Sequence, residues 1–164
     1  MSRKKALVLG VGNILFTDEG IGVHAVNYLE KNVSFGDEVA LLDGGTSGTA
    51  LMDSIMNCEF LLVLDAVLGD SPPGSLYRLV GNDLRKSLSF RDSMHQTDLV
   101  DTLIYCELAG YKPEAVVIGM EPMDYQTMGL ELSPVCRNAI PGMAQKALEE
   151  LGTRGLYPVA NNPQ

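Results

Sequence analysis

Three side chains that lie far apart in the sequence carry the donor atoms of a metal site. Glu19 and Asp65 offer carboxylate oxygens, and His95 offers an imidazole nitrogen. Three protein ligands leave one coordination position open for water or a substrate. Oxygen and nitrogen donors suit nickel or zinc, whereas calcium prefers more oxygens. The alternative is that the three are structural: a helix-dipole partner, a cap and a surface histidine. Spacing alone leaves both interpretations open.

Two glycine-rich segments follow short apolar runs. The first, residues 10–13, contains Gly10 and Gly12, but the third glycine of a dinucleotide-binding GxGxxG pattern is replaced by Leu15. The second, residues 43–48, begins with Asp43 and lacks the lysine of a phosphate-binding P-loop. It is typical of a tight strand-to-helix turn, and its backbone can also serve as an edge that holds a peptide.

Strand and helix patterns alternate along the chain. Apolar runs predict strands, and apolar residues at helical spacing predict helices. The predicted strands are residues 6–11, 39–42, 60–64, 75–80 and 115–120, and the predicted helices are residues 19–32, 51–56, 97–110 and 134–151. This alternation predicts an α/β three-layer sandwich with a mostly parallel sheet, in which residues 60–64 are central and residues 75–80 form an edge strand.

The carboxyl ends of parallel strands bind ligands in such folds. That rule gathers residues 12–19, Asp43, Asp65 and Glu121 on one rim, and His95 can reach it from a helix start. Asp18 is the expected N-cap of the first helix. The pair Ser133 and Pro134 predicts the start of the last helix.

Size and charge exclude several classes of protein. The 164 residues, 46% of them apolar, predict a single domain over residues 1–164 with a frayed tail at 155–164. The net charge of −9 argues against nucleic-acid and anionic-membrane partners. No stretch approaches the roughly 20 apolar residues of a membrane helix. The three cysteines have no CxxC spacing, which predicts buried, reduced thiols and a cytoplasmic protein.

Several motifs together resemble the hydrogenase maturation endopeptidases of nickel–iron hydrogenases. The resemblance covers about residues 6–151, and it is specific through the combination of its motifs rather than through any one of them. The matching segments are residues 10–15 (GVGNIL), 17–22 (TDEGIG), 42–46 (LDGGT), 65–66 (DA) and 95–96 (HQ). The chain departs from the commoner family pattern at His24, where arginine is frequent. From its own pattern, His24 is expected to be a partly buried helix residue.

The resemblance implies a fold, a reaction and a set of site residues. The fold is a twisted, mostly parallel five-stranded sheet between helices. The reaction is removal of a C-terminal extension from the hydrogenase large-subunit precursor after nickel insertion. Glu19, Asp65 and His95 are then the nickel-binding, catalytic residues, and the loop Asp43, Gly44, Gly45 and Thr46 positions the substrate.

The absence of a strong nucleophile motif fits a metal-assisted hydrolysis. We expect the nickel to come with the substrate, and other divalent cations can occupy the same ligands. Asp18 and Asp43 are both candidates to assist water. Two other functions remain open: a non-proteolytic metal-binding maturation chaperone, and a nucleotide-binding Rossmann-like enzyme.

Overall fold

A five-stranded sheet forms the centre of the molecule, as the computed structural model shows for residues 3–45, 47, 51–88 and 99–161. The strand order is β3-β1-β4-β6-β5. The strands are β1 (Lys4–Val11), β3 (Val39–Gly45), β4 (Cys58–Ala66), β5 (Leu76–Leu79) and β6 (Glu114–Met120). All neighbours are parallel except β5, which runs antiparallel to β6 at one edge. The predicted mostly parallel sheet and its edge strand are confirmed.

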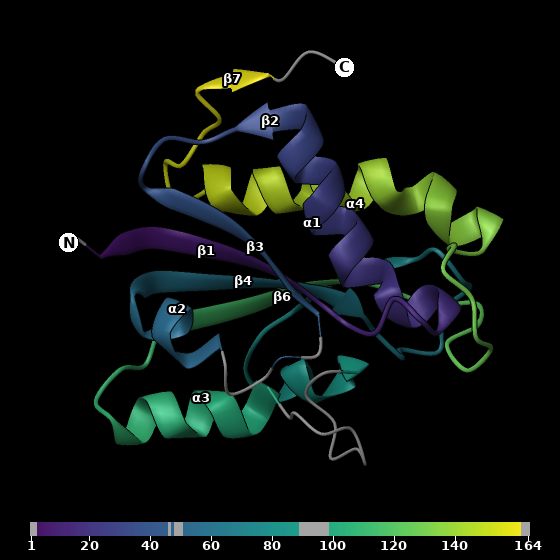
Figure 1. Cartoon of the computed structure of the whole chain (residues 1–164), viewed down its shortest axis with the longest axis horizontal. Coiled ribbons are helices and arrows are strands. Elements are labelled where there is room, and N and C mark those ends of the chain that lie inside the picture. Colours follow the sequence, from purple (N-terminus) through teal and green to yellow (C-terminus); the bar gives the residue numbers. More distant parts are fainter. Residues whose placement is uncertain (1–2, 46, 48–50, 89–98, 162–164) are drawn as a thin grey trace.

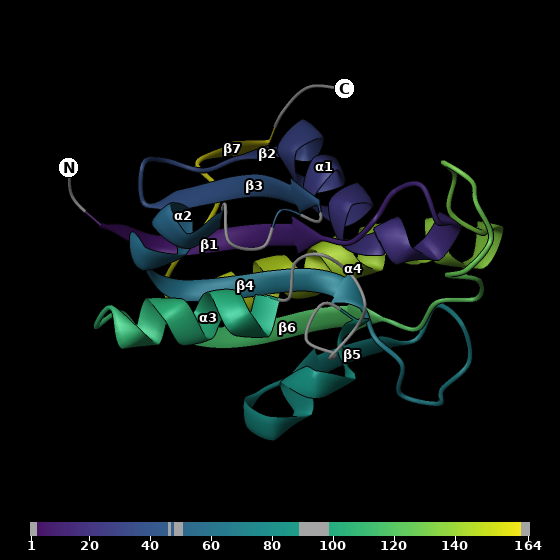
Figure 2. The ribbon, with the colours of Figure 1, turned by 60° about the horizontal axis from the view of Figure 1, so that its bottom comes forward.

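Helices cover both faces of the sheet. Figures 1 and 2 show α1 (Ile21–Asn32) and α4 (Pro134–Gly152) on one side and α2 (Met52–Met56) and α3 (Leu99–Leu108) on the other. Two short 3-10 helices, η1 (Thr17–Gly20) and η3 (Gly81–Lys86), lie in the connections. The predicted three-layer α/β architecture is therefore confirmed.

Strand β4 is central because it is apolar on both faces. Successive strand residues point to opposite sides, so Leu62 and Leu64 pack toward α1 and α4, whereas Leu61 and Val63 pack toward α2 and α3. All four side chains are fully buried. A strand that is buried on both faces has a continuous apolar sequence, and this pattern is why a central position was predicted for residues 60–64.

Glycine at position 22 lets α1 approach the sheet closely. A Cβ atom at Gly22 would stand 1.9 Å from the Leu64 carbonyl oxygen and 2.4 Å from that of Val11. No side chain fits in that space. The close approach fixes the start of α1, and with it η1, against the carboxyl ends of β1 and β4.

Two segments differ from the predictions. The first helix was expected from residue 19, but Thr17–Gly20 forms η1, and α1 begins only at Ile21. The tail was expected to be frayed from residue 155, but β7 (Ala160–Asn161) pairs antiparallel with β2 (Val33–Ser34). Among the described residues, no helix has the length and apolarity needed to cross a membrane.

Candidate active site

The strand register places the predicted acids on one rim. Gly10 of β1 pairs with Asp43 of β3 on one side and with Leu64 of β4 on the other. Asp65 follows Leu64 directly and pairs with Gly119 of β6. Asp43 and Asp65 therefore lie at the carboxyl edge of the two strands that flank β1, with the end of β1 between them. This is the edge at which α/β sheets bind ligands.

Gly12 brings the backbone of η1 against the end of β4. Its φ of +126° is open essentially to glycine alone. A Cβ atom at this position would lie 2.0 Å from the Glu19 carbonyl oxygen and 3.7 Å from Asp65 Oδ1. The backbone of Glu19 and the carboxylate of Asp65, which are far apart in the sequence, thus come close to each other at a residue without a side chain.

Asp65 is fully buried, and its orientation is set by a serine. The Ser87 hydroxyl donates a short hydrogen bond to Asp65 Oδ2. Ser87 is held there because Val67 and Ser87 form an isolated antiparallel bridge, and because the Leu68 amide donates to the Lys86 carbonyl oxygen at 3.0 Å. This leaves Asp65 Oδ1 as the oxygen on the Gly12 side. Nothing in the sequence pattern pointed to Ser87.

His95 and Thr46 lie outside the described residues, so their predicted roles stay predictions. Over residues 3–45, 47, 51–88 and 99–161 there is no group of three or more histidine, cysteine or acidic side chains that could hold a metal ion. Of the three predicted ligands, Glu19 and Asp65 belong to the described part of the chain. A complete site of the predicted kind therefore needs the His95 imidazole.

Asp18 has a different role from the expected helix cap. Its side chain is fully buried, and the N-terminal boundary of α1 is Gly20. The Asp18 carboxylate accepts hydrogen bonds from the amides of Met123 (2.9 Å), Asp124 (3.0 Å) and Ser133 (2.8 Å), and from the Ser133 hydroxyl (2.7 Å). It ties η1 to residues 123–133, the segment that leads into α4. With four donors on its two oxygens, Asp18 is an anchor rather than an acid that assists water.

Glu121 holds the loop that follows Asp65. Its side chain is buried, and Oε1 accepts hydrogen bonds from the Gly69 amide at 2.9 Å, the Ser71 amide at 3.1 Å and the Tyr77 hydroxyl at 2.5 Å. The prediction placed Glu121 on the rim with no assigned role. The structure shows that it orders the chain between β4 and β5.

The glycine-rich loop lies beside the two acids. Asp43 is exposed, and its Oδ1 accepts a hydrogen bond from the Gly45 amide at 3.1 Å. The Gly45 carbonyl oxygen in turn accepts from the Gly12 amide at 2.9 Å. A cavity of about 330 Å³ opens here, lined by Gly12, Asn13, Ile14, Leu15, Val23, Asp43 and Gly45.

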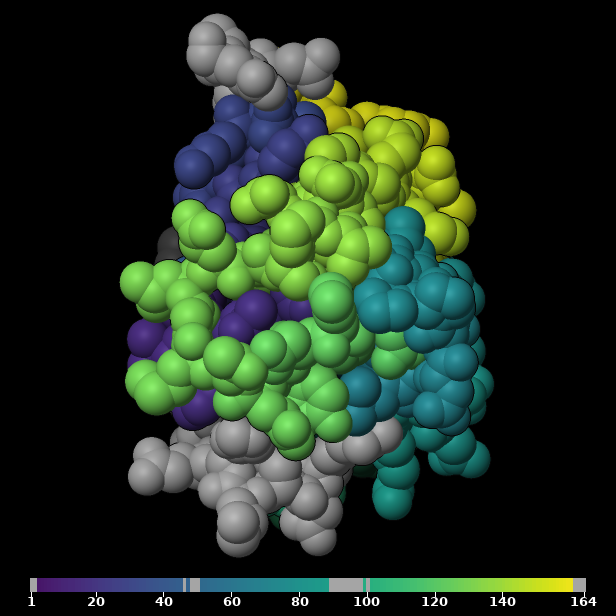
Figure 3. Space-filling model, turned by 90° about the vertical axis from the view of Figure 1, so that its right-hand side faces the viewer, coloured from purple at the N-terminus to yellow at the C-terminus, as the bar shows by residue number. Residues whose placement is uncertain are grey.

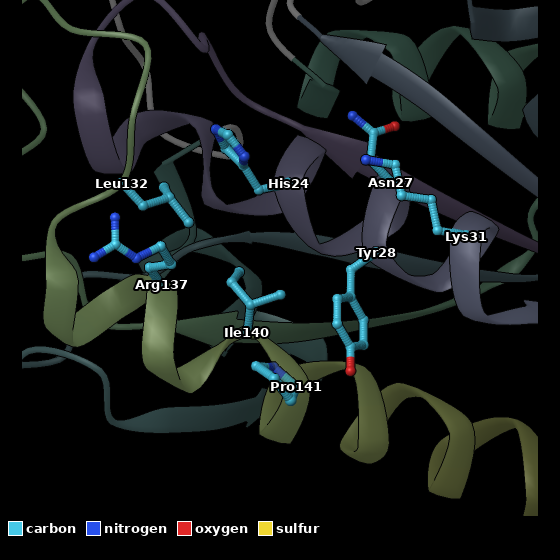
Figure 4. Close-up of a pocket in the computed structure, with 8 residues that line it drawn as sticks. All are labelled: His24, Asn27, Tyr28, Lys31, Leu132, Arg137, Ile140 and Pro141. Atoms are coloured by element: carbon cyan, nitrogen blue, oxygen red, sulfur yellow. The ribbon is translucent and has the colours of Figure 1, made fainter. Parts of the chain in front are cut away.

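A second cavity, of about 380 Å³, lies between α1 and α4 (Figure 4). Its lining in the described part of the chain includes Lys31 and Arg137 and no acidic side chain, so it lacks the oxygen donors of a metal site. His24 lies at its edge and is half-buried, as expected. Burial lowers the pKa of His24, and a hydrogen bond to the Leu130 backbone opposes that shift only in part. Burial therefore favours the neutral form of the imidazole.

The cysteines are core residues, as predicted. Cys58, Cys106 and Cys136 are all buried, with free thiols. Burial raises the pKa of the Cys58 thiol to about 11 and also raises the pKa of the other two thiols. A thiol that stays protonated is a poor nucleophile. None of the three thiols is therefore a candidate nucleophile.

Comparison with known proteins identifies relatives over nearly the whole chain. A family model described as hydrogenase maturation protease matches residues 23–150. The hydrogenase expression/formation protein HupD of Thiocapsa roseopersicina is 35% identical over 157 residues, which cover 94% of this chain and 71% of that protein. The hydrogenase 2 maturation protease of Escherichia coli K12 is 34% identical over 149 residues, covering 90% and 88% of the two chains.

A solved structure supports the same assignment. The hydrogenase maturating endopeptidase HybD from E. coli superposes with a TM-score of 0.85 at 32% identity, covering 94% of this chain and 96% of that one. The likeness therefore extends through the fold, the order of the elements and the sequence. This chain belongs to the hydrogenase maturation protease family, and it is a peptidase.

Proposed function

We propose that this peptidase removes the C-terminal extension of a nickel–iron hydrogenase large-subunit precursor after nickel has been inserted. The observation that supports the proposal is the packing of the Glu19 backbone on Gly12, next to the buried Asp65 carboxylate on the carboxyl rim of the sheet, in a chain of this family. The rim presents carboxylates and no activated thiol. Hydrolysis assisted by a metal ion is the chemistry that such a site supports.

In this proposal the nickel belongs to the substrate, and Glu19, Asp65 and His95 recognise it. Carboxylate and imidazole groups are donors that nickel accepts, and other divalent cations can occupy the same ligands. The nickel, when bound, supplies polarisation of the scissile carbonyl group or a lowered pKa of an attacking water. Recognition of the metal explains why cleavage would follow nickel insertion rather than precede it.

The neighbouring residues have separate tasks. Ser87 orients Asp65 through its hydroxyl group, and Gly12 admits the backbone of η1 to the same point. Asp43 is exposed at the cavity mouth, whereas the carboxylate of Asp18 is occupied by four donors. We therefore assign to Asp43 the positioning of the attacking water. The loop of Asp43, Gly44, Gly45 and Thr46 holds the substrate backbone.

We also propose that the protein works in the cytoplasm. Its three buried cysteines are free thiols, the state that a reducing compartment maintains. The net charge of −9 supports a protein partner rather than nucleic acid or an anionic membrane surface.

The test is mass measurement of the precursor before and after incubation with the purified protein. We expect shortening of nickel-loaded precursor and none of nickel-free precursor. Glu19→Gln, Asp65→Asn and His95→Ala should each abolish cutting, whereas the exposed acid Asp37 can be changed to Asn as a control without effect. Equal cutting of loaded and nickel-free precursor would reject metal recognition. Metal binding with an uncut precursor would instead indicate a maturation chaperone.

A further inference from the structure

We propose that the cavity next to Asp43 is a specificity pocket that holds an aliphatic side chain of the substrate close to the scissile bond. The cavity, here called the rim pocket, is lined by Gly12, Asn13, Ile14, Leu15, Val23, Asp43 and Gly45. The inference rests on the peptidase function proposed above and adds the residues that choose the cleavage sequence. Ile14, Leu15 and Val23 are those residues.

The rim pocket adjoins the reacting groups. Gly12, one wall of the pocket, is also the residue whose Cβ position lies 3.7 Å from Asp65 Oδ1. Asp43, which also lines the pocket, is the acid that we propose positions the attacking water. Consecutive Cα atoms are about 3.8 Å apart. When a substrate side chain occupies the pocket, the peptide bonds next to that residue therefore lie within about one or two residue lengths of Asp43 and Asp65. A pocket this close can set the register of the cut.

The chemistry of the walls favours an aliphatic occupant. Ile14, Leu15 and Val23 supply apolar surface, and Ile14 and Leu15 are left 41% and 49% exposed. Covering such surface is favourable by about 25 cal/mol per Å². Asp43 is the one charged group among the described residues of the lining, and its Oδ1 already accepts the Gly45 amide. A basic side chain in the pocket would contact one carboxylate and three aliphatic side chains, so the lining suits an aliphatic occupant better.

The pocket wall is rigid before substrate arrives. The Leu15 amide donates to Asn13 Oδ1 at 2.9 Å, and the Leu15 carbonyl oxygen accepts from the Gly129 amide at 2.9 Å. Phe16 and Gly129 form a parallel bridge directly beside it. Leu15 is therefore fixed from both sides of its backbone. A preordered wall lowers the entropy cost of binding, as specificity pockets require.

An exposed apolar surface continues from the pocket. Met128 and Leu130 flank Gly129 and are 74% and 65% exposed. Figure 3 looks at this side of the molecule, where the purple segment that contains η1 lies among the green residues 121–133. Apolar side chains gathered beside a site mark a protein contact. The substrate is a protein, so the pocket and this surface serve the same partner.

The experiment measures kcat/KM for nickel-loaded precursor with variants of both molecules. Leu15→Ala should lower kcat/KM about tenfold, since removal of methylene groups from an apolar pocket costs about that much. Leu108→Ala removes the same atoms from an 80% exposed leucine of α3 and should change nothing. Precursor residues flanking the cut are then changed to Ala one at a time. At one aliphatic precursor position, the change to Ala should lower kcat/KM with the wild-type enzyme. The same change should lower kcat/KM little further with the Leu15→Ala enzyme.

Binding of the precursor to the Asp65→Asn protein separates this proposal from the peptidase proposal. Leu15→Ala in that background should weaken precursor binding, and Leu108→Ala should not, whether or not the wild type cuts. Circular dichroism checks that each variant is folded. The pocket assignment is overturned if Leu15→Ala behaves like Leu108→Ala in both assays, or if the precursor residue coupled to Leu15 is basic. Failure of cutting with retained dependence on Leu15 overturns only the peptidase proposal.

Discussion

Replacing Asp18 with alanine tests whether this buried acid is an anchor or a participant in catalysis. Its carboxylate accepts four hydrogen bonds from Met123, Asp124 and Ser133, at 2.7–3.0 Å. All three partners are more than 100 positions away in the sequence. Asp18→Ala removes the shared acceptor and leaves three amides and one hydroxyl group to find other partners.

The size of the effect follows from which donors water can reach. A hydrogen bond to a charged group contributes about 1.5–3 kcal/mol, so four bonds set an upper limit well above what a single mutation usually costs. Met123 is 65% exposed, and water can replace the acceptor for its amide and for that of neighbouring Asp124. The two bonds to Ser133, at the start of α4, account for most of the loss. We expect destabilisation of about 3 kcal/mol, or a fall in Tm of about 6–12 °C.

Urea unfolding followed by circular dichroism gives this free energy directly. Asp18→Asn keeps one acceptor oxygen and should lie between the wild type and Asp18→Ala. The exposed Asp37→Ala serves as the control and should unfold like the wild type. If Asp18→Ala lost less than about 1 kcal/mol yet lost all peptidase activity, the anchor role would be wrong, and Asp18 would belong to the reacting groups.

Four further changes test other parts of the site and its support. Gly12→Ala places a Cβ atom 2.0 Å from a backbone oxygen at a φ of +126°, so we expect a loss of about 3 kcal/mol or more in unfolding free energy, together with loss of activity. Ser87→Ala removes the hydrogen bond to the buried carboxylate and should lower kcat/KM about 10–100-fold; because both groups are fully buried, it should also cost about 1.5–3 kcal/mol of unfolding free energy. Glu121→Ala should speed hydrogen exchange at the Gly69 and Ser71 amides, which donate hydrogen bonds to the Glu121 carboxylate. Glu150→Gln should lower the free energy of unfolding in urea by about 2 kcal/mol at pH 7. This value is below that of a fully buried ion pair because one of the two arginine partners of Glu150 is half-exposed.

The Glu150 prediction carries its own pH test. Burial alone would raise the pKa of Glu150, but hydrogen bonds and charges from Arg78 and Arg154 outweigh it and leave the pKa lowered from 4.5. A lowered folded-state pKa gives stability that is present above the unfolded value and is lost as the pH falls through the folded value. The difference between wild type and Glu150→Gln should therefore be full near pH 7 and shrink below about pH 4.5. A difference independent of pH would show that the arginine pairs do not act through charge.

The parts of the fold that were predictable are those decided by short stretches of sequence. A run buried on both faces, such as residues 60–64, fixes a central strand without help from distant residues. Ser133 and Pro134 fixed the start of α4 in the same way, because proline suits the first helical turn. The carboxyl-edge rule then brought Asp43 and Asp65 to one rim from topology alone.

The parts that were missed depend on contacts between distant segments. Asp18 looked like a local cap, but its partners lie in residues 123–133, and sequence spacing carries no signal of such a contact. Ser87 gained its role through a bridge to Val67, in a segment that reads as a polar loop. The pairing of Ala160 with Ser34 likewise joins two-residue strands, which are too short for any periodic pattern.

The adjacent acids of η1 illustrate how a distant anchor can orient a reacting group. A 3-10 helix has about three residues per turn, so the side chains of Asp18 and Glu19 point about 120° apart. Four hydrogen bonds hold the Asp18 side chain toward residues 123–133, and the backbone carbonyl group of the next residue, Glu19, packs on Gly12 beside Asp65. The bonds of Asp18 therefore fix the backbone segment to which Glu19 belongs. A substitution at Ser133 removes two of the four bonds to Asp18 and should therefore loosen the backbone of η1 at Glu19.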